Sequence, residues 1–413
     1  MLTSYALDAE VRPATANWLS SSNNISQQFL AFGGRNDVVS LAGGLPAAEL
    51  YPVEAIQAAA RLALETHGSA VLEYGAVEGF LPLRELIAER MSRQTGGSFT
   101  AANVLLTTGA MQGLDLIGKV LLDRDDLVVT QSPTYLGALD AWRPRTPSYR
   151  KLDWACTDAS SDAVLPDAKF VYVVPNFSNP TGVLVPQDQR AALLRKVVDA
   201  GTWLIEDDPY HSIALDGPTG ANIIELYVRD NPGPYSGPVI YLGTVSKSIV
   251  PGLRVGWMIA EPNMIQNFAL AKQSSDMSSS VLTQAITFEL LATPFEGEHR
   301  AQMVETYRER RDVLCREAAA RLGKWFEWSV PVGGMFVWMR SKGQLIDTTE
   351  LYRFAVEEKV AFVPSVVFDF ADDDRFAMRL NFTRSSPELL VEGVRRLQVA
   401  VERYLMTVEQ EAV

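Results

Sequence analysis

Lys247 lies in the segment GTVSKSIVPGLRVGW, where most of its neighbours are apolar. A lysine is seldom fully buried unless it is paired or used, because taking an ammonium group out of water is costly. Two hydroxyls, of Thr244 and Ser246, precede it and Arg254 follows, and together these donors can bind a phosphate dianion. Desolvation and nearby positive charge favour the neutral amine that forms Schiff bases. The segment therefore predicts either a lysine exposed on a turn or a reactive amine beside a phosphate site.

Three further segments place polar groups directly after apolar runs. GAMQG follows VLLTT and can offer free backbone N–H groups to a phosphate at the start of a helix, although a tight turn also explains its glycines. PNFSNPTG can present Asn179 as a rigid amide donor or form an ordinary turn. EDDPYH can place the carboxylate of Asp207 and the phenol of Tyr210 on one side of a turn, or form a solvated acidic loop. We expect the neighbouring His211 to be structural.

The elements that must position these groups alternate between strand-like and helical patterns, which is typical of an α/β sheet. Residues 53–67 predict a helix between Pro52 and Gly68. The runs NVLLTTG, DLVVTQSP, KFVYVVPN, TWLIEDD, PVIYLGTVSK and VGWMIA predict strands covered on both faces. After about residue 300 a long charged helix, two strand-like runs and a last helix from about residue 386 predict a smaller α+β domain.

Open α/β sheets bind ligands beyond the carboxyl ends of their strands, so the four polar segments are expected to meet there. Together they supply a phosphate cradle, an amine for an imine, a carboxylate for a pyridine nitrogen and donors for a ring oxygen. Pyridoxal 5'-phosphate (PLP) needs these parts. The carboxylate, for which Asp207 is the candidate, keeps the ring nitrogen protonated and makes the cofactor an electron sink.

Composition sets the limits of this interpretation. The chain has 413 residues, 47% of them hydrophobic, enough for a large core and more than one domain. A net charge of -13 argues against nucleic acid or an anionic membrane as the main partner. Cys156 and Cys315 lie far apart without the spacing of metal ligands, so we expect buried apolar thiols and no metal site. Asp8 and Glu10 stand where a signal peptide would be basic and then apolar, and we expect a cytoplasmic protein without membrane spans.

The motifs as a set resemble the class I/II aminotransferases of PLP fold type I. The resemblance is nearest to the branch with 2-aminoadipate and kynurenine aminotransferases and MocR-type regulators, and SLAGGLP, PTY, PNFSNPTG, DDPY, SKSIVPGLRVGW and GGMFVW carry it in the family's order. It implies an α/β fold whose large domain, residues 46–295, has a mixed, mostly parallel seven-stranded sheet between helices. It also implies a small α+β domain at 296–413 and an N-terminal arm or lid at 1–45 that packs with it.

The resemblance also implies roles for individual residues. Lys247 would hold the cofactor as a Schiff base and move the substrate proton, and Asp207 would pair with the ring nitrogen. The phosphate would be bound by Thr244, Ser246, Arg254 and the backbone of Ala110 and Met111, where many relatives have polar side chains. Tyr135 would stack on the ring, Asn179 and Tyr210 would donate to its oxygen, and Arg379 would grip the substrate carboxylate beside Gly44. Tyr74 would reach the phosphate of a neighbouring subunit, which predicts a homodimer with shared sites.

The expected reaction is a ping-pong transfer of an amino group from an L-amino acid to a 2-oxo acid such as 2-oxoglutarate. Phe29, Leu30 and Phe32 favour a large apolar or aromatic donor, while Arg35 is suited to an acidic side chain. Two alternatives stay open: a PLP-dependent lyase, cyclase or oxidase on the same fold, and a sensor that binds PLP and an amino acid without turnover. A DNA-binding regulator is disfavoured, because only about forty residues precede the matching region.

Overall fold

The computed structural model describes residues 16–19, 37–152, 154, 165–371 and 373–411. The expectations for Phe29, Leu30, Phe32, Arg35 and Cys156 lie outside these residues. Cys315 is buried, and burial raises the pKa of its thiol to about 11, as expected for an unreactive apolar side chain. Among the helices of the described part, none is long and apolar enough to cross a bilayer.

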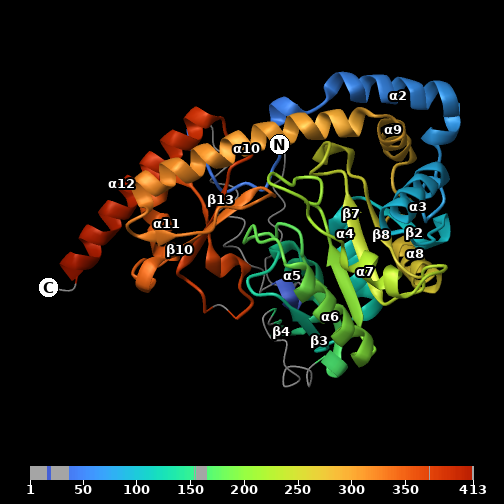
Figure 1. The fold of residues 1–413 in the computed structure, drawn as a ribbon, viewed down its shortest axis with the longest axis horizontal. Coiled ribbons are helices and arrows are strands. Elements are labelled where there is room, and N and C mark those ends of the chain that lie inside the picture. Colours follow the sequence, from blue (N-terminus) through green and yellow to red (C-terminus); the bar gives the residue numbers. More distant parts are fainter. Residues whose placement is uncertain (1–15, 20–36, 153, 155–164, 372, 412–413) are drawn as a thin grey trace, which may run out of the picture.

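A seven-stranded sheet forms the centre of the larger half of the molecule (Figure 1). Its strands stand in the order β2 (Val104–Thr107), β8 (Gly256–Ile259), β7 (Val239–Thr244), β6 (Trp203–Asp207), β5 (Ala168–Val173), β3 (Leu127–Thr130) and β4 (Ser148–Lys151). All neighbours are parallel except β8, which runs antiparallel to both β2 and β7. The prediction of a mixed, mostly parallel seven-stranded sheet is therefore confirmed.

Except at the edge strand β4, both faces of this sheet are buried, because the other strands carry apolar residues at successive positions. In β5, Phe170 and Tyr172 enter the core on one face, and Val171 and Val173 enter the core on the other. Helices α4 (Ala110–Leu121), α5 (Leu136–Trp142) and α8 (Pro262–Asp276) cover the first face. Helices α3 (Leu81–Thr95), α6 (Gln187–Ala200), α7 (Ile223–Asp230) and α9 (Val281–Leu291) cover the second.

Two local details show what the sequence pattern captured and missed. Helix α2 (Val53–His67) has the predicted bounds, with Pro52 at its N-cap and Gly68 at φ +58° after its end. Strand β4 was not predicted, because SYRK at the sheet edge has no apolar run and is mostly exposed.

A second, antiparallel sheet follows in the chain, in the order β12 (Val363–Pro364), β13 (Ala377–Asn381), β10 (Phe336–Ser341) and β9 (Phe326–Glu327). It packs with helices α10 (Phe295–Leu322), α11 (Thr348–Glu357) and α12 (Pro387–Glu411). Strand β1 (Val39–Ser40) pairs with β11 (Val360–Ala361), which joins the N-terminal part of the described chain to this half. Helix α10 runs along the molecule from α12 to α9 (Figure 1).

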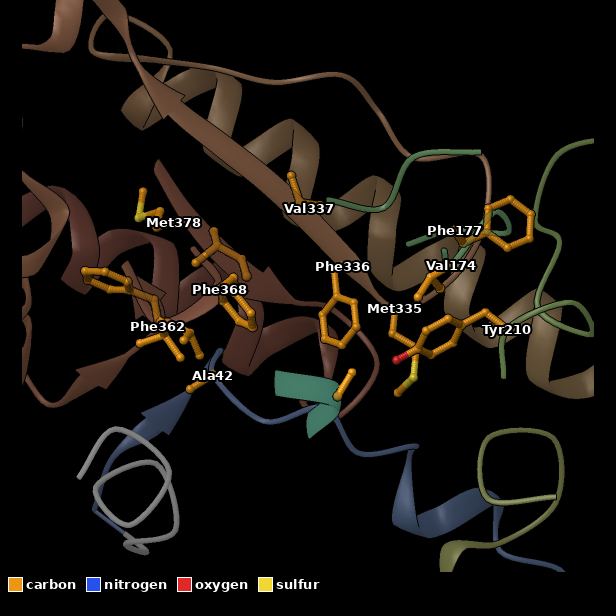
Figure 2. Close-up of a cluster of buried hydrophobic side chains, with 14 of the residues drawn as sticks. Ala42, Val174, Phe177, Tyr210, Met335, Phe336, Val337, Phe362, Phe368 and Met378 are labelled. Carbon is orange, nitrogen blue, oxygen red and sulfur yellow. The ribbon is translucent and has the colours of Figure 1, made fainter. Parts of the chain in front are cut away.

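The core continues from the second sheet to the strand ends of the first. Figure 2 shows the Phe336 ring of β10 between Phe368 and Tyr210. The centroids of the Tyr210 and Phe336 rings lie 6.1 Å apart, nearly perpendicular to each other. Since Tyr210 follows β6 of the large sheet, this aromatic contact joins the two halves beside the carboxyl ends of the central strands.

Candidate active site

The polar segments that follow β2, β5, β6 and β7 meet at one edge of the large sheet, as parallel strands require. Two adjoining cavities of about 230 and 320 Å³ open there. Twelve predicted residues line one cavity or both: Gly44, Ala110, Met111, Tyr135, Asn179, Asp207, Tyr210, Thr244, Ser246, Lys247, Arg254 and Arg379. We call the first the cofactor cavity, because it contains Asp207 and Arg254, and the second the substrate cavity, because it contains Arg379.

Lys247 lies in the turn after β7 and lines both cavities, so a lysine that merely projects from a turn is ruled out. Its Nζ donates a 2.7 Å hydrogen bond to the carbonyl oxygen of Gly44. Burial lowers the pKa of Lys247 to about 8, and the positive charges of Arg379 and Arg254 act in the same direction. The neutral, nucleophilic share of this amine near neutral pH is therefore far larger than for a lysine at its ordinary pKa, although the protonated form still predominates at pH 7.

Asp207, the last residue of β6, is buried, and the alternative of a solvated acidic loop is wrong. The hydroxyl of Tyr172 donates a 2.8 Å hydrogen bond to Oδ2, while the buried Oδ1 has no partner among the described residues. Burial raises the pKa of Asp207 to about 7, although the Tyr172 hydrogen bond lowers it. A buried oxygen without a donor fits a ligand that brings an N–H group to this point of the cofactor cavity.

The neighbouring carboxylates of Glu206 and Asp208 hold the loop that carries Asp207 and Tyr210. Glu206 accepts hydrogen bonds from the first two backbone N–H groups of α7, at 2.7 and 2.9 Å. Asp208 accepts hydrogen bonds from Asn176, Asn222 and Tyr241 at 2.8 to 3.0 Å. Sequence reasoning missed this structural role, because adjacent carboxylates in a polar segment look the same whether they are solvated or buried.

The start of α4 has the geometry of a phosphate cradle. Gly109 precedes the helix at φ +94°, and a Cβ there would lie 2.8 Å from a guanidinium nitrogen of Arg254. Arg254 donates a 2.8 Å hydrogen bond to the carbonyl oxygen of Thr108. The hydroxyls of Thr244 and Ser246 lie 3.0 Å apart on the same side of the cofactor cavity. A helix start, two hydroxyls and an arginine thus surround one small volume.

Arg379 of β13 reaches across to the strand ends of the large sheet. It donates to Oδ1 of Asn179 at 2.7 Å and to the carbonyl oxygen of Ala42 at 2.6 Å, while its buried Nε has no partner in the part of the chain that the structure describes. Its guanidinium lies over the rings of Phe336 and Phe368, 4.3 and 4.8 Å from their centroids. Burial lowers the pKa of Arg379 to about 10. Among the described residues no carboxylate pairs with Arg379, so its charge stays available to an anionic ligand.

Of the two predicted tyrosines Tyr135 and Tyr74, the first lies in the site and the second on the surface. Tyr135 lines both cavities, and burial raises its pKa to about 12. Its ring lies over Gly137, where an added Cβ would be 2.5 Å from the ring. Tyr74 is 82% exposed and lines neither cavity, so it is not a core aromatic and does not join the site within one chain.

Three residues beside the site were missed by sequence reasoning. Tyr172 occupies an ordinary position in the strand pattern KFVYVV, and only the sheet reveals that it points at Asp207. Phe336 belongs to the motif GGMFVW but had no assigned role, and here it underlies Arg379. Asp140 lines the substrate cavity, but its neighbours in the short helix α5 form no motif that would indicate a binding site.

The chain belongs to the class I and II aminotransferases, because the family of that description matches residues 36–397. It is 34% identical over 377 residues to the aromatic-amino-acid aminotransferase 1 of Thermococcus litoralis, covering 89% of this chain and 88% of the relative. It is 36% identical over 389 residues to the 2-aminoadipate transaminase of Thermus thermophilus, covering 92% and 94%. The kynurenine aminotransferase of Pyrococcus horikoshii, solved in complex with PMP, superposes with a TM-score of 0.85 at 32% identity, covering 93% of this chain and 95% of the other.

The protein is therefore a PLP-dependent aminotransferase, and its residues fit the cofactor. The unpartnered oxygen of Asp207 suits a protonated pyridine nitrogen, and the cradle at Gly109 suits a phosphate. When bound, PLP supplies an electron sink for the electrons left on Cα as its proton departs. The alternative of a sensor without turnover is disfavoured by these relatives and by the intact lysine.

Proposed function

We propose that this aminotransferase takes its amino group from a large apolar or aromatic L-amino acid and passes it to a 2-oxo acid such as 2-oxoglutarate, in two successive half-reactions. The observation that carries this proposal is the substrate cavity, where Arg379 stands beside an apolar wall formed by Leu136, Val363, Val367 and Phe368. A guanidinium with a free Nε suits an α-carboxylate, and the apolar wall suits a large side chain. The names of the relatives, aromatic, kynurenine and 2-aminoadipate aminotransferases, agree with a long substrate.

The cofactor cavity supports the proposed binding roles. Arg254, Ser246 and Thr244 would hold the phosphate together with the backbone N–H groups of Ala110 and Met111 at the start of α4. Neither side chain at those two positions offers a hydroxyl, so the backbone would provide the contacts there. Tyr135 would stack on the ring, and Asp207 would accept a hydrogen bond from the ring nitrogen.

The substrate side of the site supports the other roles. Arg379 would grip the α-carboxylate, oriented by its hydrogen bonds to Asn179 and Ala42. Because Oδ1 of Asn179 accepts from Arg379, its Nδ2 is the end available to donate to the cofactor, beside the Tyr210 hydroxyl. Lys247 would remove the proton from the substrate Cα and return it to the cofactor, since its amine lies in both cavities and its lowered pKa provides a neutral base.

A homodimer with shared sites is part of the proposal. Tyr74 is 82% exposed, and nearby apolar side chains on and after α2 are exposed as well: Val53, Leu62, Leu64 and Leu72. Such a surface suits a second copy of the chain, which would bring its Tyr74 to the phosphate of this one. The domain limits at residues 45 and 295 and a cytoplasmic location also stay predictions.

The test is a spectrum of the purified protein with PLP before and after single L-amino acids are added, with 2-oxo acid and ammonia measured in each mixture. We expect the band of covalently bound PLP to give way to that of its amino form, with one equivalent of 2-oxo acid and no ammonia. The best donors should be large and apolar or aromatic. Continuous release of ammonia would support a lyase or oxidase, and faster reaction with aspartate would contradict the proposed donors.

Lys247→Ala is the matched control for this assay. The variant should fold, bind PLP without covalent attachment and form no 2-oxo acid, because no other described lysine lines either cavity. Full turnover by Lys247→Ala would remove the proposed mechanism.

A further inference from the structure

Asp140 is a carboxylate in the substrate cavity that the proposed reaction does not use. Among the described residues that line this cavity, the charged ones are Lys247, Arg379 and Asp140. Lys247 and Arg379 would bind the parts common to every amino acid, the amino group and the α-carboxylate. Asp140 is therefore the charged residue left to interact with the part that differs, the side chain of the substrate.

Asp140 lies on the side of helix α5 that lines the substrate cavity. Asp140 comes four residues after Leu136 and three after Gly137, so it lies on the same side of the helix as both, and all three residues line the cavity. Phe368 lines the same cavity, and the backbone N–H of Thr134, shortly before α5, donates a 2.9 Å hydrogen bond to the carbonyl oxygen of Phe368. The segment that leads into α5 is thus tied to a residue of the apolar wall.

Arg143 determines which groups Asp140 can accept. The Arg143 guanidinium lies 2.6 Å from Oδ1 of Asp140, which leaves Oδ2 as the oxygen that can accept from a substrate. The side chain of Asp140 is 42% exposed and that of Arg143 is 20% exposed. Because the pair already contains one positive charge, the second oxygen suits a neutral hydroxyl or N–H donor better than a full cation. A second carboxylate would meet a negative oxygen there.

We propose that Asp140 is a specificity-determining residue, which accepts a hydrogen bond from a neutral O–H or N–H group at the far end of the amino-donor side chain. The substrate class is then an aromatic L-amino acid whose ring carries such a group, held along the apolar wall by its ring and at Asp140 by its polar end. This inference rests on the proposed function, because it takes Arg379 as the site of the α-carboxylate.

The first test compares L-tyrosine with L-phenylalanine, which differ by one hydroxyl. We expect the wild-type kcat/KM for L-tyrosine to exceed that for L-phenylalanine by about tenfold or more, the order expected for a hydrogen bond to a charged group. In Asp140→Leu the ratio should fall to near one, mainly through loss of activity with L-tyrosine. A ratio near one in the wild type, or an unchanged ratio in Asp140→Leu, would overturn the proposal.

Asp115→Leu is the control, since Asp115 is also 42% exposed and also paired with a basic residue nearby in the sequence, Lys119 at 2.8 Å, but lines neither cavity. It should keep the wild-type ratio. Asp140→Asn is a second variant in case Asp140→Leu does not fold. Its neutral oxygen still accepts a hydrogen bond, so we expect a ratio between one and the wild-type value. A ratio equal to the wild-type value would contradict the role of the charge.

Unreactive analogues separate this inference from the proposed function. The dissociation constants of 3-(4-hydroxyphenyl)propionate and 3-phenylpropionate are measured by calorimetry on the PLP-loaded protein. The hydroxylated analogue should bind more tightly to the wild type and equally well to Asp140→Leu. If no amino acid reacts while this difference holds, the proposed function fails and the role of Asp140 stands. If amino acids react and the analogues bind alike, only the role of Asp140 fails.

Discussion

The hydroxyl of Tyr172 donates a 2.8 Å hydrogen bond to Oδ2 of Asp207, which leaves Oδ1 of the same carboxylate as its unpartnered end. Both side chains are buried in the large sheet, on the neighbouring strands β5 and β6. The phenol therefore fixes which oxygen faces the cofactor cavity, and it favours the ionised form of a carboxyl group whose burial favours the neutral form.

Tyr172→Phe removes this hydrogen bond while keeping the ring. We expect the pKa of Asp207 to rise further, and the PLP dissociation constant at pH 7.5 to increase by about tenfold, the order of a hydrogen bond to a charged group. Calorimetric titration of the apoprotein with PLP measures the change. Tyr235→Phe is the control, because Tyr235 is buried and donates to the carbonyl oxygen of Val239, away from both cavities. Equal PLP affinity in both variants would contradict a tuning role.

Asp207→Ala should keep covalent PLP but lose at least about a hundredfold in kcat, because the ring nitrogen loses the carboxylate that keeps it protonated. The absorbance spectrum checks attachment, and single-turnover formation of 2-oxo acid checks the chemistry. A rise in KM with an unchanged kcat would show that Asp207 only helps to bind the substrate.

The lowered pKa of Lys247 sets the pH dependence of cofactor attachment. The neutral amine is the reactive form, and its share rises with pH until the pH passes the pKa. A lysine at its ordinary pKa would react faster up to about pH 10.5, whereas with a pKa of about 8 the rate should level off above pH 8. Stopped-flow absorbance of the apoprotein with PLP from pH 6 to 10 measures this. A rate that still rises steeply at pH 9.5 would contradict the depressed pKa.

Gly137→Ala tests the contact between α5 and the Tyr135 ring. An alanine Cβ would lie 2.5 Å from that ring, so the ring must move, and we expect weaker PLP binding with an intact fold. Gly297→Ala in α10 is the matched control, since its Cβ would meet nothing within 4 Å. The control should gain about 0.5–1 kcal/mol in the free energy of unfolding, as is usual for glycine to alanine within a helix. PLP titration and thermal unfolding of both variants separate the two effects.

The sequence was most informative where backbone pattern and residue type agreed. Lys247 and Asn179 each follow an apolar strand and Asp207 is the last residue of one, and a parallel sheet brings such strand ends together. The bounds of α2 could be predicted because Pro52 and Gly68 mark its two ends.

The remainder depended on contacts between distant segments. The roles of Tyr172 and Asp140 depend on which face of an element they occupy, and a strand or helix of four to seven residues does not reveal which side faces a cavity. The acidic segment was ambiguous for a related reason. Glu206 and Asp208 are stabilised by the N-terminus of α7 and by Asn176, partners that only the folded chain provides.

The two cavities share five lining residues, Met111, Tyr135, Asn179, Tyr210 and Lys247. Leu136, Asp140, Val363 and Val367 line the substrate cavity alone, and Asp207, Ser246 and Arg254 line the cofactor cavity alone. Substitutions at the four positions that line the substrate cavity alone can therefore change the accepted amino acid without loss of the cofactor. For directed evolution these four are the positions to randomise, and those that line the cofactor cavity are the positions to keep. A small library confined to the four positions should yield aminotransferases of new selectivity.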